Sequence, residues 1–119
     1  MRPAELGAAV VALADRLTAA GLPATTDPRN INPPCAWVTL GAATFPTLCG
    51  DLDATASVLL IVPDNGMPTA MHQLGELLDR FTAAEVDLPT GDVLPDTVTI
   101  PGAGAGPLPA LRLTIPIGA

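Results

Sequence analysis

The stretch at residues 52–62 constrains the fold of this chain more than any other. Its even-numbered positions are all apolar, whereas its odd-numbered positions are polar at the start and apolar at the end. Because successive side chains of a strand point to opposite faces of a sheet, this alternation predicts a strand. One end is expected to be buried on both faces and the other on one face only. We therefore expect a central strand whose first residues project beyond the sheet.

Two segments show the apolar period of helices that cover a sheet. The first helix is expected at residues 3–20, with an apolar stripe of Leu6, Val10, Leu13 and Leu17. Gly21 is expected to end this helix in a left-handed conformation, and Pro23 prevents its continuation. The second helix is expected at residues 68–84, with a stripe of Met71, Leu74, Leu77, Leu78 and Phe81. Each helix has one stripe, so each is expected to pack on a sheet.

Shorter strands should complete that sheet, at residues 24–26, 35–40, 44–48, 97–100 and 110–115, with loops at 87–96 and 101–109. The segment 44–48 is expected to fold back through a turn near Gly41 and to pair antiparallel with 35–40. That pairing would bring Cys35 opposite Leu48 or Cys49, and two reduced thiols are favoured there over a disulfide in a cytosolic protein. The predicted fold is α+β: an antiparallel or mixed sheet of about five strands with two helices packed on one face, in one domain spanning residues 1–119.

The balance of charges argues against several classes of partner. Twelve carboxylates stand against five arginines and no lysine, which gives a formal net charge of −7. Surfaces that bind nucleic acids need clustered cations, so no dedicated DNA or RNA surface is expected. No segment reaches the roughly 18 apolar residues of a membrane span. Charged residues within the N-terminal apolar run argue against a signal peptide, so we expect a protein made in the cytoplasm.

The residues that usually carry catalysis are few and isolated. His72, the only histidine, is expected on the solvent side of its helix, and the only serine, Ser57, lies within a strand. Cys35 and Cys49 have no adjacent cation, and with one histidine they match no standard spacing of metal ligands. The glycine-rich stretch 102–106 leads into a proline-rich strand, whereas a phosphate-binding loop leads into a helix. We therefore expect no catalytic, cofactor-binding or metal-binding residues.

A proline-rich lead-in to the strand at 35–40 carries a family resemblance. It reads Asp27-Pro28-Arg29-Asn30-Ile31-Asn32-Pro33-Pro34-Cys35. Other parts agree in the same order, namely Phe45, Leu48-Cys49-Gly50, Val62-Pro63, Pro101-Gly102 and Pro109-Ala110. In this pattern the chain resembles tail terminator proteins from long-tailed phages of actinobacteria, a group similar to the lambda-type terminator. The resemblance extends over nearly the whole chain.

The resemblance implies a structural virion protein and no catalysis. Proteins of this family assemble as a hexameric ring at the head-proximal end of the tail. The ring caps the tail tube, ends polymerisation of the major tail tube protein and joins the tail to the head connector or stopper. Genomic DNA passes through its lumen without specific binding, and no membrane or cofactor is involved. The alternatives left open are another neck-ring component, such as a head–tail adaptor or stopper, and a small stand-alone ligand-binding domain or enzyme.

Such a ring needs contacts between unlike surfaces of neighbouring subunits. We expect them at the irregular segment and at the projecting start of the central strand, which gives the set Asp27, Pro28, Arg29, Asn30, Ile31, Asn32, Asp51 and Asp53. Prolines stiffen the irregular segment, so it loses little entropy on docking. Arg29 is expected to pair with a carboxylate of its own or a neighbouring subunit. Trp37 is expected in the core or at a subunit interface, with the core favoured, and its indole N–H is expected to bond to the backbone.

Overall fold

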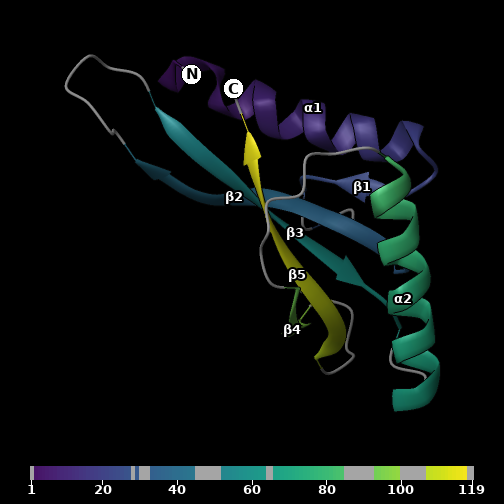
Figure 1. Cartoon of the computed structure of the whole chain (residues 1–119). Coiled ribbons are helices and arrows are strands. Elements are labelled where there is room, and N and C mark those ends of the chain that lie inside the picture. Colours follow the sequence, from purple (N-terminus) through teal and green to yellow (C-terminus); the bar gives the residue numbers. More distant parts are fainter. Residues whose placement is uncertain are drawn as a thin grey trace.

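The computed structural model describes residues 2–27, 29, 33–44, 52–63, 66–84, 93–99 and 107–117 (Figure 1). In chain order its elements are the 3₁₀ turn η1 (Pro3–Glu5), α1 (Leu6–Ala19), β1 (Ala24–Thr25), β2 (Cys35–Thr44), β3 (Asp53–Ile61), α2 (Met67–Ala83), β4 (Leu94–Val98) and β5 (Leu108–Ile117). The five strands form one sheet in the order β1-β2-β3-β5-β4. The pair β1–β2 is parallel and the other three pairs are antiparallel, so the sheet is mixed, as predicted.

Both helices cover the same face of this sheet, which confirms the predicted α+β arrangement. One buried cluster joins side chains of α1 and α2 to side chains of the three middle strands. The helices contribute Leu13, Leu17, Leu74, Leu77 and Phe81, and the strands contribute Val38, Val58, Leu60, Leu113 and Ile115. Burial of these aliphatic and aromatic side chains is the main stabilising term of the fold. The opposite face carries no helix in the part of the chain that the structure describes.

The alternation within β3 confirms its predicted place at the centre. Its even-numbered residues face the helices and are buried. On the other face Asp53 is exposed, whereas Leu59 and Ile61 are buried, so the strand ends buried on both sides. The prediction that β3 projects beyond its neighbours is wrong, because β2 and β5 accompany it to its first residues. These three strands extend together beyond the short strands β1 and β4.

The first helix begins and ends close to its predicted limits. Gly21 has a φ of 96°, a left-handed conformation that glycine adopts without steric cost. The backbone N–H of Leu22 donates to the C=O of Leu17 at 3.0 Å, and the Leu22 side chain is fully buried. This arrangement satisfies a carbonyl of the last helical turn and directs the chain into β1.

The prediction of a turn near Gly41 is wrong. β2 runs continuously through this position and pairs with β3, and the register shifts between Leu40 and Ala42 at a β-bulge. Cys35 therefore lies opposite Ile61. Of the predicted strand 44–48 only Thr44 is described, and it is the last residue of β2. Cys49 lies outside the described residues, so the expectation of two reduced thiols stays a prediction.

Two further boundaries differ from the sequence analysis. Met71 does not belong to the buried stripe of α2; its side chain is 56% exposed, and Ala70 takes the inward position. The predicted loop at 87–96 overlaps β4, which begins at Leu94 and contains Pro95. Proline is tolerated there because β4 is an edge strand with one side unpaired. β5 is longer than predicted at both ends.

Candidate functional site

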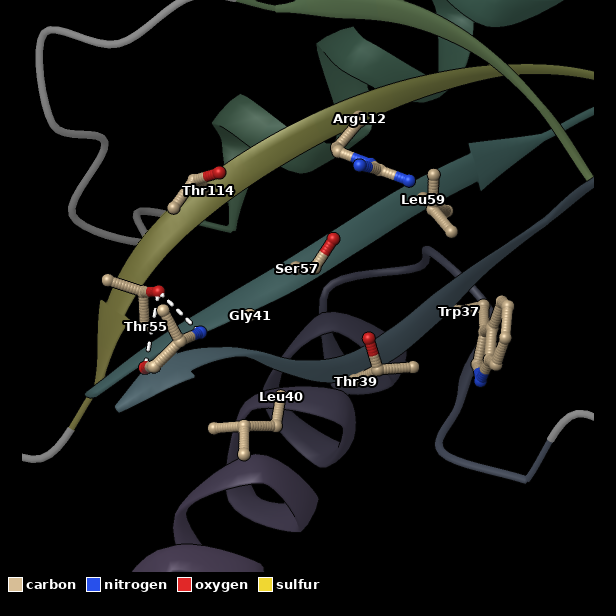
Figure 2. Close-up of a pocket in the computed structure, with 10 residues that line it drawn as sticks. Trp37, Thr39, Leu40, Gly41, Thr55, Ser57, Leu59, Arg112 and Thr114 are labelled. Carbon is tan, nitrogen blue, oxygen red and sulfur yellow. Dashed lines mark hydrogen bonds between the residues drawn. The ribbon is translucent and has the colours of Figure 1, made fainter. Parts of the chain in front are cut away.

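The helix-free face of the sheet holds an open depression of about 420 Å³. Figure 2 shows that β2, β3 and β5 contribute its lining. Four of the lining side chains carry hydroxyl groups: Thr39, Thr55, Ser57 and Thr114. The odd-numbered polar positions of residues 52–62 had indicated an open face here. That threonines of two other strands join them follows only from the register of the sheet.

Among the described residues that line this depression, Arg112 is the only charged one. Its guanidinium forms an ion pair with the carboxylate of Asp96 on β4, across the β4–β5 pair. Both side chains remain partly exposed, so the pair contributes little to stability. The pair nevertheless neutralises the charge of Arg112, and the remaining polar groups of the described lining are neutral donors and acceptors.

The described residues that line the depression do not form the arrangement that nucleophilic catalysis requires. Ser57 lies in the middle of β3, and the chain's only histidine, His72, is exposed on α2, which covers the opposite face. A serine nucleophile needs a base within hydrogen-bond reach. Among the described residues no three histidine, cysteine or carboxylate side chains form a group that could hold a metal ion.

Trp37 departs from its predicted place. It lies on the helix-free face and is half-buried, because the alternation of β2 sends Ala36 and Val38 towards the helices. There it packs against a small second cluster that includes Cys35 and Leu59. Its indole nitrogen Nε1 is buried but has no hydrogen-bond partner among the described residues. The favoured prediction of a core tryptophan bonded to the backbone is therefore wrong, and its place at a subunit interface stays a prediction.

The irregular segment after β1 confirms the predicted pairing of Arg29 with a carboxylate. Asp27 Oδ1 accepts hydrogen bonds from the backbone N–H of Arg29 at 2.9 Å and from its Nε at 3.3 Å. Asp27 Oδ2 accepts a bond from Arg29 Nη2 at 3.3 Å. The backbone N–H of Asp27 in turn donates to Thr25 Oγ1 at 3.1 Å. The pairing lies within one chain and holds the turn that leaves β1.

The pKa of the Asp27 carboxyl is lowered from its ordinary value of 3.8, first by the backbone N–H of Arg29 and then by its guanidinium. We therefore predict that Arg29→Ala raises this pKa only in part, because the backbone donor remains. An NMR titration of the Asp27 carboxyl carbon in both proteins measures the two values. A complete return to 3.8 in the variant would assign the shift to the guanidinium instead.

The direction of this pKa shift also determines how the stability of the turn depends on pH. Since the pKa is lower in the folded chain than in the unfolded one, the ionised carboxylate stabilises the turn above the unfolded value. That contribution is lost as the pH falls through the lower, folded value.

The predicted contact residues do not gather in one place. Asp27 and Arg29 follow β1, which pairs with β2 at Ala36 and Trp37. Asp53 lies opposite Thr44, and the rise of a strand puts Thr44 roughly 23 Å beyond Trp37 along β2. The remaining members, Pro28, Asn30, Ile31, Asn32 and Asp51, lie outside the described residues. Of the described members, Arg29 and Asp53 are exposed and Asp27 is half-buried, and Asp53 lies apart from the other two.

No protein-family model, curated protein or solved structure matches this chain. None of the helices in the described part is long and apolar enough to span a membrane.

Proposed function

We propose that this chain is a ring-forming tail terminator of a long-tailed phage. In this role six copies cap the tail tube at its head-proximal end, stop polymerisation of the tube protein and join the tail to the head connector. The proposal starts from the pattern of residues 27–35 and of the later motifs. It includes no catalytic step, and it locates the protein in the neck of the virion.

The structural observation that carries the proposal is the separation of the two contact surfaces. A ring forms when one surface of each subunit meets a different surface of the next. Arg29 follows β1, which pairs with β2 near its start, and Asp53 lies opposite Thr44, the last residue of β2; both side chains are exposed. Two such surfaces on one rigid sheet have the placement that a head-to-tail contact requires.

The charge of the chain supports the passage of DNA. Six chains of net charge −7 carry 6 × −7 = −42. A lumen that shares this negative charge repels the phosphate backbone and keeps the genome from binding in transit. No specific DNA contact is part of the proposal.

We predict that the purified chain assembles to about 72 kDa, six times its mass of 12.0 kDa. Adding it to polymerising tube protein should stop tube growth, which electron microscopy of tube lengths measures. The Arg29→Ala variant should assemble less well, because it loses the side-chain contacts that hold its turn. Arg80→Ala is the matched control, since Arg80 is an exposed arginine on α2 and is not one of the predicted contact residues.

A chain that stays monomeric, or a ring that leaves tube growth unchanged, would contradict the proposal. A ring that binds the portal in place of the tube would identify a head–tail adaptor or stopper. A monomer that binds a small molecule in the helix-free depression would identify a ligand-binding domain, the alternative that this depression favours.

A further inference from the structure

The outer edge of β2 is unpaired over most of its length in the part of the chain that the structure describes. β1 pairs with this edge only at Ala36 and Trp37, although β2 continues to Thr44. An unpaired edge presents backbone N–H and C=O groups that can pair with another strand. The edge of β2 from Val38 to Thr44 is therefore the longest unpaired length of strand edge in the described sheet.

The alternation of the backbone shows which groups this edge offers. Ala36 donates its N–H outward, to the C=O of Pro23 beside β1. Alternate residues of a strand direct their backbone groups to the same side, so the backbone N–H and C=O of Leu40 also point outward. Beyond the bulge, Ala42 and Thr44 lie opposite Thr55 and Asp53. The backbone N–H and C=O of Ala43, between them, point outward again.

The other outer strands have prolines where β2 has none. Pro95 lies in the edge strand β4. In β5 the C=O of Pro109 accepts from Val62, on the β3 side, so Pro116 faces the opposite side and removes a donor there. Proline and charged side chains are the usual means of blocking strand addition at an edge. Residues 38–44 contain neither.

Apolar side chains beside this edge are incompletely covered. Leu40 is 46% exposed, and Figure 2 shows it directed towards the side of the sheet where α1 lies. On the apolar stripe of α1, Leu13 and Leu17 are buried, but Leu6 and Val10 nearer its start are only half-buried. The strand β1 ends before it reaches this region.

We propose that the outer edge of β2, from Val38 to Thr44, binds an extended segment of a partner protein as an added strand. The side chains of the bound segment are apolar on the α1 side, where they cover Leu40, and polar on the side of Thr39. The segment carries lysine or arginine at its ends, because a chain of net charge −7 attracts cations and repels acidic peptides. Backbone pairing supplies affinity, and the alternating side chains supply selectivity.

This site would be a further partner contact of the proposed terminator. The inference rests on that function only where it names the tube or connector protein as the source of the segment. A second copy of this chain is a poorer occupant, since its own edge at residues 38–44 carries no lysine or arginine. The edge itself is defined by the strand register and does not depend on a ring.

The test uses the whole chain and a short synthetic peptide of alternating valine and threonine with a lysine at each end. We expect the peptide to shift the amide NMR signals of Leu40 and Ala43 and to slow their hydrogen exchange. The Leu40→Pro variant should bind the peptide about tenfold more weakly, since one or two backbone hydrogen bonds are lost. Thr114→Pro is the matched control, because Thr114 and Pro116 direct their backbone groups to the same outer side of β5, and its binding should be unchanged.

Unchanged binding by a folded Leu40→Pro variant would overturn the inference, as would peptide shifts confined to other strands. If Leu40→Pro does not fold, a peptide with N-methylated valines replaces it. That peptide must lose binding, and equal binding overturns the inference. Slow exchange at Leu40 that depends on protein concentration without peptide would show a second copy at the edge and overturn the proposed occupant. Ring assembly without peptide binding would contradict the proposed edge site and leave the proposed ring intact. Peptide binding by a monomer would contradict the proposed ring and leave the edge site intact.

Discussion

Replacing Phe81 by alanine is expected to lower the free energy of unfolding by about 3–5 kcal/mol. Phe81 is the largest fully buried side chain among the described residues, and it lies in the cluster where α2 meets the sheet. Truncation removes apolar contacts and leaves a cavity that the surrounding strands fill only in part. Since a domain of this size is stable by about 5–15 kcal/mol, the loss is a large fraction of the total.

Urea unfolding followed by circular dichroism measures this effect. Met71→Ala is the control on the same helix, because the Met71 side chain is 56% exposed and makes no part of the core. The control should change the free energy by less than about 0.5 kcal/mol. Equal losses in the two variants would contradict the placement of α2 that the structure shows.

The second large effect is expected at Gly41, within the bulge of β2. A Cβ added there would lie 3.0 Å from Thr55 Oγ1, 3.2 Å from Thr55 O and 3.3 Å from Ser57 N. Two of these are backbone atoms of β3, so the strand pair itself must move. Thr55 Oγ1 also accepts the N–H of Ala42 at 3.1 Å, which the same displacement breaks. We expect Gly41→Val to destabilise the chain by about 1–3 kcal/mol.

Gly75→Ala is the matched control for this variant. Gly75 lies in the middle of α2, and an added Cβ would meet nothing within 4 Å. Alanine is a better helix former than glycine, so this change should stabilise the chain by roughly 0.5–1 kcal/mol. Thermal unfolding of both variants gives shifts of opposite sign. A stabilising Gly41→Val would contradict the close approach of Gly41 to Thr55 and Ser57 of β3.

Local pattern was sufficient for the elements whose residues interact mainly with their neighbours in sequence. The stripe of α1, the glycine that ends it and the alternation of β3 were all predicted close to their observed limits. The pairing of Asp27 with Arg29 belongs to the same class, because the two residues are two positions apart. Period and turn chemistry act over a few residues, and a single sequence displays them directly.

Contacts between distant residues were decided by the tertiary structure alone. Gly41 reads equally well as a turn or as a bulge, and only the pairing of β2 with β3 selects the bulge. Trp37 is apolar enough for the core, but the choice of which face the helices cover places it on the other side. The helix-free depression and the open edge of β2 likewise depend on strand register. Register brings together residues far apart in the chain, whereas the alternation within one strand fixes only the face on which each residue lies.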